Sequence, residues 1–550
     1  MQLIERRIGL LFAVFLLALA IGATKAAWLG VVKAPTLKRA AATQQVAQIE
    51  IPARRGSIAD VHGIDLAVSE PAMDIAATTF LIKDATKVAA QLSPLIGRPE
   101  DALLRKLAKP AGFVYLARGV PAAKAEQAKA LKIEGLEFIP RYKRDYPRTW
   151  TASQLLGSTG TDDQGLGGLE YSLEKQLTGT TGERRLVKDA LGRPIEMRDT
   201  KPVKPGHNVR LTLDSRLQDR AEAVLGEVGR AWKPYGATAI VMDPNSGAIL
   251  ALANWPRVNA NEPDAAPEHA RSNRAISVNY EPGSTFKAFT VAAALEDGKV
   301  TTNQKFQIPP VLAIADRELH DAEDHGWETM TTSDILRVSS NIGAVLIARE
   351  VGTKRFDAWL HKWGFGKPTG VDLPGEQRGQ VLPLDQYSGS TMGNLPIGQG
   401  ISVTPMQMMA GYAAIANGGI LRPPHIVASV NGKATKKPAG RRVISEATAA
   451  SLRKMLEGVL GPGGTATGAE IKGYTLAGKT GTAEKAIDGK YSEEKYVASF
   501  IGFAPAAHPK LLVAVVVDEP EGEIYGGQVA APAWREIVNS ALTYLKIAPE

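Results

Sequence analysis

The chain has 550 residues, which is too many for one ordinary domain and predicts two or three domains plus an anchor. Its content of 44% hydrophobic and 22% charged residues is typical of a globular protein and excludes a disordered or fibrous one. The net charge of +8 comes without a block of Lys and Arg interleaved with aromatic residues, which argues against nucleic-acid binding. The chain contains no cysteine, so disulfides, thiolate zinc sites and cysteine nucleophiles are excluded.

An uncharged run from Ile8 to Thr24 follows Arg6 and Arg7 near the N-terminus. Its 17 residues reach the lower limit for a helix that spans a membrane, so we predict an uncleaved anchor. A cleaved signal peptide is the alternative, because small residues lie between Ala20 and Ala23. Basic residues flank the run on both sides, so the positive-inside rule does not decide its orientation. No later stretch predicts a second span, which places the remaining chain on one side of the membrane.

Residues 31 to about 205 form a first region of mixed character. Residues 54–67 predict a strand, a glycine-containing turn and a second strand, and helical spacing follows at 100–107 and 122–131. A further helix is expected to end at Thr178-Gly179. We find no nucleophile beside a base in this region, and therefore predict a structural or docking module.

A second unit begins at Pro205-Gly206. Its predicted elements are a strand at 208–214, a helix at 215–228, an antiparallel hairpin at 237–253, strands at 472–482, 496–503 and 510–517, and a last helix at 531–544. Strands at both ends of the unit with helices between them predict an antiparallel sheet packed between helices, an α+β fold.

A helix in this unit combines an apolar surface with a nucleophile. Pro282 and Gly283 break the preceding structure, and residues from Ser284 onward predict a buried helix that Gly298 closes. Ser284 and Lys287 share one helix face, and a buried amine beside a hydroxyl at a helix N-terminus is a plausible activated nucleophile. Ser-x-x-Lys is not specific alone, because it recurs at Ser172/Lys175, Ser451/Lys454 and Ser492/Lys495.

Two short motifs downstream make Ser284 stand out from these other matches. Ser339-Ser340-Asn341 lies between a predicted helical stretch and the helix that starts at Ile342. Lys479-Thr480-Gly481-Thr482 holds the only Lys-Thr-Gly of the chain and lies on a predicted strand. Gly481 leaves room there for another backbone segment to lie close against the strand.

The three motifs occur in the order Ser-x-x-Lys, Ser-x-Asn, Lys-Thr-Gly, separated by 55 and 140 residues. This set resembles the penicillin-recognising serine enzymes. Most of the chain is similar to the class B penicillin-binding proteins. The pedestal signatures of that family resemble Arg55–Asp60 with His62-Gly63, Arg144–Pro147 and Gly165–Gly179. Its transpeptidase domain resembles Gly398–Gly400 with Thr404-Pro405, and Tyr525–Gly527. The sequence departs from the family at Val61, where the pedestal motif usually has Arg.

The resemblance implies a penicillin-binding transpeptidase fold, a five-stranded antiparallel sheet between helices. An elongated α+β pedestal and an N-terminal transmembrane helix would precede it. The implied domains are a cytoplasmic tail and anchor at 1–30, the pedestal at 31–205 and a serine transpeptidase domain at 206–550. The implied location is the bacterial cytoplasmic membrane, crossed once, with the catalytic domain outside the cytoplasm. Neither a cofactor nor a metal is implied.

The resemblance also implies the chemistry of acylation. Ser284 would attack the carbonyl between the last two D-alanines of a peptidoglycan stem peptide, and Lys287 would accept the hydroxyl proton. The second role requires a neutral amine, and burial together with the nearby Lys479 would lower the pKa of Lys287. Ser339 would relay the proton to the leaving amine, and Asn341 would hold Lys287 and the substrate amide.

The same resemblance implies how the substrate is held. Lys479, Thr480, Gly481 and Thr482 would bind its terminal carboxylate. The backbone N–H groups of Ser284 and Thr482 would form the oxyanion hole. An amine from a second stem peptide would then take the acyl group, whereas a β-lactam would acylate Ser284 and remain attached. The implied partners are stem peptides, β-lactams, the membrane, a membrane glycan polymerase and other division proteins, without nucleic acid.

Asn341 and the Tyr525-Gly-Gly segment favour the division (septal) branch, because the elongation branch has Asp in place of this Asn. Two rival functions use the same fold. A β-lactamase would hydrolyse the acyl-enzyme but would need neither anchor nor pedestal, and a non-catalytic β-lactam sensor would not need an intact Lys287.

The polar stretch His320–His325 contains two His and three acidic residues. It lacks the His-Glu-x-x-His spacing of a zinc helix, so we predict a solvated loop near the cleft.

Overall fold

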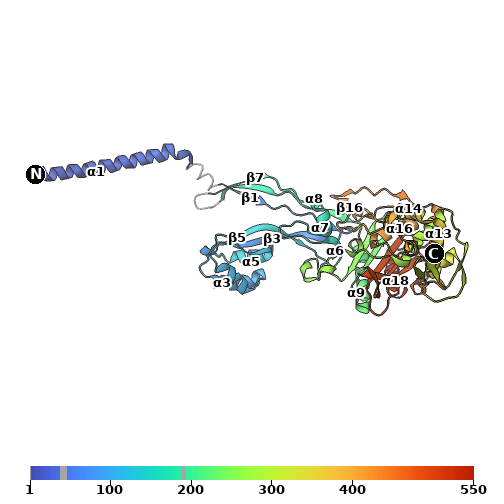
Figure 1. Ribbon diagram of the computed structural model, residues 1–550. Coiled ribbons are helices and arrows are strands. Elements are labelled where there is room, and N and C mark those ends of the chain that lie inside the picture. Colours follow the sequence, from blue (N-terminus) through green and yellow to red (C-terminus); the bar gives the residue numbers. More distant parts are fainter. Residues whose placement is uncertain (1, 37–45, 189–193, 488, 550) are drawn as a thin grey trace. The chain divides into compact units, whose positions relative to one another are not determined.

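The computed structural model describes residues 2–36, 46–188, 194–487 and 489–549 (Figure 1). The chain divides into two compact units, each built from separate segments. Unit 1 comprises 1–54, 71–142 and 179–206, and unit 2 comprises 55–70, 143–178 and 207–550. The domain boundaries predicted at residues 30 and 205 stay predictions.

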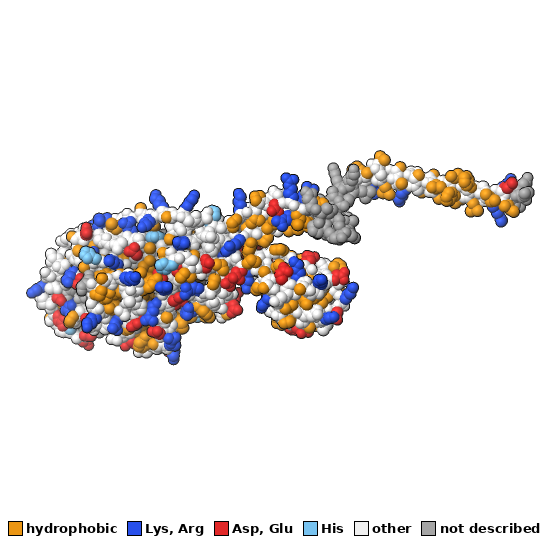
Figure 2. Space-filling view, turned by 180° about the vertical axis from the view of Figure 1, so that it is seen from behind, with side chains coloured by type: hydrophobic (Ala, Val, Ile, Leu, Met, Phe, Trp, Pro, Cys, Tyr) orange, Lys and Arg blue, Asp and Glu red, His pale blue; other side chains and the backbone are white. Residues whose placement is uncertain are grey.

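Helix α1 (Gln2–Ala27) continues into a π-helical turn, η1 (Trp28–Val32). The stretch Ile4–Val32 is long and apolar enough to cross a membrane, and it is the one such helix in the described part of the chain. Its side chains are exposed, and Figure 2 shows hydrophobic side chains along the whole helix. A helix satisfies its own backbone hydrogen bonds, so this segment suits a lipid environment.

The remaining part of unit 1 contains an α+β layer and a separate sheet. Strand β3 pairs with β4 and β5, and the helices α3, α4 and α5 bury Leu92, Leu103 and Ala125 in one core with Leu116 of β4. The bounds are β3 (Asp65–Ala77), β4 (Val114–Pro121), β5 (Leu136–Asp145), α3 (Ala85–Ile96), α4 (Glu100–Leu107) and α5 (Ala122–Ala130). The two helices predicted at 100–107 and 122–131 are confirmed.

The second sheet of unit 1 has the order β1-β6-β7 and is antiparallel. Its strands are β1 (Val46–Ile51), β6 (Gly182–Lys188) and β7 (Pro194–Lys201). The sequence did not predict these strands. In β6 and β7, several charged residues weaken the alternation of apolar and polar positions on which strand prediction depends.

Unit 2 is built around a five-stranded antiparallel sheet with the order β10-β9-β21-β20-β19. The strands are β9 (Gly236–Met242), β10 (Ile249–Trp255), β19 (Ala477–Ile487), β20 (Lys490–Ala504) and β21 (Leu511–Asp518). The predicted antiparallel sheet with strands from both ends of the unit is confirmed. Every residue of β9 and β21 is buried, which means that helices cover both faces of the sheet.

The helices that cover the sheet form two groups (Figure 1). Helices α9 (Ser215–Trp232) and α18 (Gly526–Tyr544) pack against each other and against the sheet. Helices α11 (Lys287–Glu296), α16 (Pro405–Ala416) and α17 (Glu446–Glu457) form the second group. All twelve residues of α16 are buried, so this helix lies in the core of the unit.

Several shorter elements complete unit 2. They are β2 (Ile58–Ala59), α6 (Ser153–Leu156), α7 (Gly168–Ser172), α8 (Glu174–Leu177), β8 (Val209–Leu211), α10 (Arg274–Ser277), β11 (Lys305–Ile308), β12 (Leu312–Ile314), β13 (Arg317–Leu319), β14 (Glu328–Thr331), α12 (Thr332–Val338), α13 (Asn341–Val351), α14 (Thr353–Trp363), α15 (Thr391–Asn394), β15 (Ile420–Leu421), β16 (Val427–Val430), β17 (Lys433–Ala434) and β18 (Arg441–Arg442). Several predicted starts differ from those observed. Helix α18 begins five residues before the predicted residue 531, β20 begins six residues before the predicted residue 496, and β19 begins five residues after the predicted residue 472. A 3₁₀ turn replaces the first turn of the helix predicted at Ser284.

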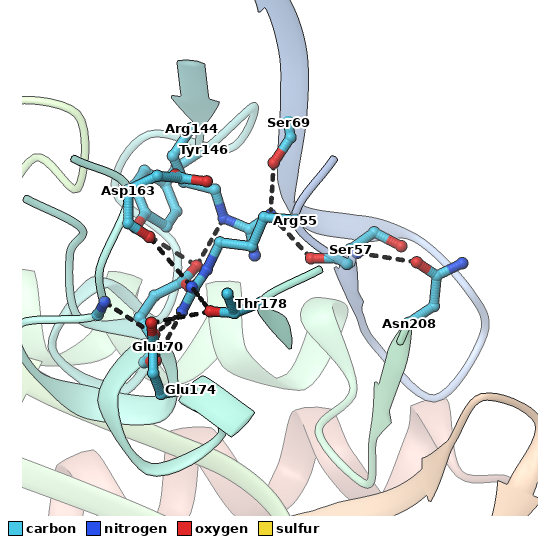
Figure 3. Close-up of polar contacts among 12 residues, drawn as sticks. Arg55, Ser57, Ser69, Arg144, Tyr146, Asp163, Glu170, Glu174, Thr178 and Asn208 are labelled. Carbon is cyan, nitrogen blue, oxygen red and sulfur yellow. Dashed lines mark hydrogen bonds and ion pairs between the residues drawn. The ribbon is translucent and has the colours of Figure 1, made fainter. Parts of the chain in front are cut away.

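A buried Arg–Glu cluster joins three of the segments that resemble pedestal signatures (Figure 3). Arg55 and Arg144 both direct their Nε atoms at the carboxylate of Glu170, each at 2.7 Å. The three side chains are at most 2% exposed. Arg55 also pairs with Glu174. Val61 lies outside this cluster and is exposed, so the departure from the family pattern leaves these ion pairs intact.

Candidate active site

Ser284 lies in the 3₁₀ turn η5 (Gly283–Phe286), which leads directly into α11. Two contacts from other segments hold this turn. The N–H of Gly283 donates to the carbonyl of Gly398 at 3.1 Å, and the hydroxyl of Tyr412 donates to the carbonyl of Thr285 at 2.7 Å. A Cβ atom on Gly398 would lie 2.2 Å from the oxygen of Gly283, so this close contact requires glycine. The nucleophile candidate is therefore presented by a backbone that is fixed from two sides.

Lys287 is the first residue of α11, and its side chain is 1% exposed. Its Nζ donates to the carbonyl of Ser339 at 2.5 Å and to Oδ1 of Asn341 at 2.7 Å, and it lies 3.3 Å from Oγ of Ser339. The lysines of the three other Ser-x-x-Lys matches, Lys175, Lys454 and Lys495, are exposed. Burial thus distinguishes the Ser284 pair from the others.

Ser339 forms the sharp turn between α12 and α13. Its φ is +65°, in the left-handed region that a residue with a Cβ rarely adopts. This conformation turns both the carbonyl and the hydroxyl of Ser339 toward the amines of Lys287 and Lys479. The strain in the turn serves to place two polar groups of one residue at the site.

Strand β19 brings the third motif to the same place. Nζ of Lys479 donates to Oγ of Ser339 at 2.9 Å and to the carbonyl of Thr480 at 3.2 Å, and Lys479 is fully buried. Ser339 therefore bridges the two lysines. The structure brings Lys287, Ser339, Asn341 and Lys479 into one hydrogen-bonded group beside the turn that holds Ser284.

The sheet edge packs directly against the turn of Ser284. A Cβ atom on Gly481 would lie 2.4 Å from Oγ of Ser499, 2.9 Å from Cγ2 of Thr285 and 3.0 Å from the carbonyl of Pro282. The predicted reason for glycine, close approach of another backbone segment, is confirmed. A Cβ on Gly283 would in turn lie 3.0 Å from the carbonyl of Thr482. The backbones that contain the N–H groups of Ser284 and Thr482 are thus neighbours.

The two buried amines have displaced pKa values. Burial lowers the pKa of Lys287 to about 7, and the negative charge of Asp321 opposes that effect. Burial and the positive charge of Lys287 lower the pKa of Lys479 well below its ordinary value. A neutral amine at Lys287 is therefore accessible near neutral pH, which is what proton acceptance from a serine hydroxyl requires.

Three contacts of the site were not predicted from the sequence. The hydroxyl of Thr465 lies 2.7 Å from that of Thr480, and the N–H of Gly526 donates to Oγ1 of Thr482 at 3.0 Å. Gly526 belongs to the Tyr525-Gly-Gly segment, and the resemblance of this segment to the family was the one sequence signal that could have pointed to its contact. Asp321 accepts hydrogen bonds from the turn that contains Ser339 and Asn341.

The prediction of a solvated loop at 320–325 is wrong for two of its residues. The side chains of Asp321 and His325 are only 9% and 12% exposed and bond to each other. Asp321 is drawn in because the backbone donors at the start of α13 need an acceptor, and His325 follows because its ring bonds to Asp321. Within the described ranges, no group of three or more His, Asp or Glu side chains could hold a metal ion.

Family models match two stretches of the chain. Residues 237–539 match the penicillin binding protein transpeptidase domain, and residues 50–211 match the penicillin-binding protein dimerisation domain. The chain therefore belongs to the penicillin-binding proteins with a transpeptidase domain. The presence of both domains makes it a class B member, as the sequence predicted.

Individual relatives align over nearly the whole chain. The peptidoglycan D,D-transpeptidase FtsI of Escherichia coli is 34% identical over 100% of this chain and 93% of its own length. The stage V sporulation protein D of Bacillus subtilis is 35% identical over 90% of this chain and 79% of its own. A crystal structure of penicillin binding protein 3 from Mycobacterium tuberculosis in complex with aztreonam has a TM-score of 0.72 at 29% identity, covering 91% of this chain and 98% of that one.

Proposed function

We propose that the protein is a peptidoglycan D,D-transpeptidase that cross-links stem peptides through an acyl-enzyme on Ser284. One observation supports this most strongly: the amine of Lys287 is buried beside the turn of Ser284 and bonded to both Ser339 and Asn341. A protein that only bound a peptide would gain no affinity from such an amine. Among the described residues no carboxylate pairs with it, and burial disfavours its charged form.

Acylation starts with the neutral amine of Lys287, which accepts the proton of the Ser284 hydroxyl as Oγ attacks the carbonyl carbon of the penultimate D-alanine. The negative charge that forms on the carbonyl oxygen is stabilised by the backbone N–H groups of Ser284 and Thr482. The C–N bond then breaks, and the departing D-alanine amine receives a proton through Ser339, whose hydroxyl lies between the two lysine amines. The products are the Ser284 ester and free D-alanine.

The Lys-Thr-Gly strand binds the terminal carboxylate of the donor peptide. An anion next to Lys479 stabilises its charged form, so carboxylate binding raises the pKa of Lys479 from its depressed value. The hydroxyl of Thr482 is oriented by the N–H of Gly526, and that of Thr480 by Thr465. In the second half-reaction, the amine of a neighbouring stem peptide attacks the ester, forms the cross-link and releases Ser284.

We assign the enzyme to septal wall synthesis during cell division. Asn341 stands where the elongation branch has Asp, and the alignment with a transpeptidase named FtsI spans the whole chain. The helix at 4–32 anchors the protein, with the catalytic domain on the outer side of the cytoplasmic membrane, where peptidoglycan lies. A glycan polymerase and other division proteins act with it there.

Penicillin labelling of the full-length protein in detergent tests this function. We expect stoichiometric, long-lived labelling of Ser284, no label on Ser284→Ala, and release of D-alanine from a stem-peptide donor by the wild type alone. Rapid hydrolysis of the drug would indicate a β-lactamase, and labelling without any D-alanine release would indicate a sensor. Depletion in cells should give filaments, whereas rounded cells would indicate the elongation branch.

A further inference from the structure

Asp321 lies outside the three motifs, yet it accepts three hydrogen bonds from the turn that contains two of the proposed catalytic groups. Its Oδ1 accepts from the N–H of Asn341 at 2.5 Å and from that of Ile342 at 3.0 Å. Its Oδ2 accepts from the hydroxyl of Ser340 at 2.7 Å. The first backbone donors of α13 are thus satisfied by a carboxylate that comes from a loop twenty residues earlier.

The neighbour of Asp321 fixes the orientation of Asn341. The side-chain Nδ2 of Asn341 donates to the carbonyl of His320 at 2.9 Å, so Oδ1 is left facing Nζ of Lys287 at 2.7 Å. The reverse orientation of the amide would place two donors against each other at Lys287. The loop therefore determines which atom of Asn341 meets the amine.

His325 holds the other side of the Asp321 carboxylate. Its Nε2 lies 3.1 Å from Oδ2 of Asp321, and its Nδ1 lies 2.6 Å from the carbonyl oxygen of Gly326. Both ring nitrogens face acceptors, and only the doubly protonated imidazolium donates from both. The hydrogen bond to Gly326, opposed by burial and aided by Asp321 and Glu328, raises the pKa of His325.

We propose that Asp321 is a positioning residue of the transpeptidase, which holds the Ser339–Asn341 turn against Lys287 and is itself held by His325. This proposal rests on the catalytic roles assigned above to Lys287, Ser339 and Asn341. The turn needs such support because Ser339 has a positive φ, a strained conformation for a residue that carries a Cβ atom. Through its charge, Asp321 also acts on the protonation of Lys287.

The charges around Asp321 and His325 predict the direction in which substitution of each residue shifts the pKa of Lys287. Asp321 faces His325 and acts on Lys287, Lys287 and Lys479 act on each other, and Glu328 acts on His325. Removing the carboxylate lowers the pKa of Lys287, because Asp321 raises it. Removing the positive charge of His325 leaves Asp321 less compensated and raises the pKa of Lys287. The two substitutions should therefore shift the Lys287 titration in opposite directions.

The experiment measures the second-order rate constant of acylation by penicillin against pH for the full-length wild type, Asp321→Asn and His325→Gln. Asp324→Asn is the matched control, because Asp324 is exposed on the same loop. We expect Asp321→Asn to lower the rate roughly 10- to 100-fold and to shift the acid limb of the profile to lower pH. His325→Gln should shift the limb to higher pH, and Asp324→Asn should match the wild type.

Two outcomes would overturn the proposal. One is a profile for Asp321→Asn that coincides with that of Asp324→Asn. The other is a uniform loss of rate with no shift in either variant, which would mean that Asp321 only supports the fold. If Asp321→Asn does not fold, the direction of the shift in His325→Gln decides alone. Loss of labelling in Ser284→Ala is independent of all these results, so the proposed function is tested separately.

Discussion

Two of the groups of buried cations in unit 2, the Arg–Glu cluster and the lysines of the candidate active site, differ in what surrounds them. In the Arg–Glu cluster, Arg55 and Arg144 share the carboxylate of Glu170 at 2.7 Å, and the ion pairs leave the charges fixed. In the site, Lys287 and Lys479 bond to hydroxyl, carbonyl and amide oxygens, and among the described residues no carboxylate pairs with either amine.

The pKa values show the consequence of this difference. Burial lowers the pKa of Arg55, but Glu174 and Glu170 more than offset it, and the pKa of Arg55 is raised. At Lys287 burial dominates and the pKa falls to about 7. A buried guanidinium paired with carboxylates contributes structure, because an arginine keeps its proton near neutral pH. An unpaired buried amine can exchange a proton with a substrate, and it therefore suits catalysis.

The largest effect should come from removing the unpaired amine. Lys287→Met keeps the apolar stem but has no proton acceptor, so we expect acylation by penicillin to fall roughly 10³-fold or more. Stability should not fall. The pKa of Lys287 in the folded state lies below its value in the unfolded state, so the charged amine destabilises the folded wild type. This destabilisation has its full size below pH 7 and decreases as the pH rises above 7.

Stopped-flow kinetics of the full chain measure the loss of acylation. Thermal unfolding at about pH 6 and pH 9 measures the change in stability. The gain in stability of Lys287→Met over the wild type should be larger at the lower pH. Acylation within about tenfold of the wild-type rate would rule out Lys287 as the proton acceptor.

The second prediction concerns a substitution that breaks the Arg–Glu cluster. Glu170→Gln leaves two buried guanidinium groups without their shared counter-ion, and we expect a loss of about 3–5 kcal/mol in the free energy of unfolding. Denaturant unfolding measures this loss. Molecules that remain folded should still acylate at Ser284, since the cluster is not part of the site.

Glu536→Gln is the control for this experiment, because it breaks an ion pair with Arg220 in which both side chains are exposed. We expect a change below about 1 kcal/mol there. Equal effects from the two substitutions would contradict the distinction between the buried cluster and an ordinary surface pair.

A smaller effect is expected from Gly481→Ala, which pushes β19 away from the turn of Ser284. The new methyl group would meet Oγ of Ser499 and the backbone of Pro282, so the strand must move. We expect roughly tenfold slower acylation and a loss of about 1–3 kcal/mol in stability. Gly468→Ala is the control, because a Cβ there meets nothing within 4 Å. A normal acylation rate in Gly481→Ala would show that this close approach is not needed for catalysis.

The sequence predicted the sheet and the proposed catalytic residues because each leaves a signal that can be read directly along the chain. Strands β19, β20 and β21 contain many apolar residues, and the three short motifs occur in one fixed order. The 3₁₀ turn at Ser284 could not be predicted, because it depends on the contact with Gly398, more than a hundred residues later. Propensity describes a segment alone and does not include such contacts.

Asp321 could not be predicted for a related reason. An acidic loop that caps a distant helix has the same composition as an acidic loop in solvent, and only the fold shows which donors it meets. The β6–β7 pair was missed because its alternating charges hide the strand pattern. Both failures concern charged residues, whose partners in the fold cannot be read from composition and periodicity.

The central claim is that an unpaired buried amine with a pKa near neutrality activates Ser284. The most direct test is the pH dependence of the second-order rate constant for acylation of the wild type by penicillin, because this constant reports the titration of the free enzyme. We predict an acid limb with its midpoint at about pH 7, where Lys287 loses its proton. A midpoint near pH 10, the ordinary value for a lysine, or a rate independent of pH would contradict the claim.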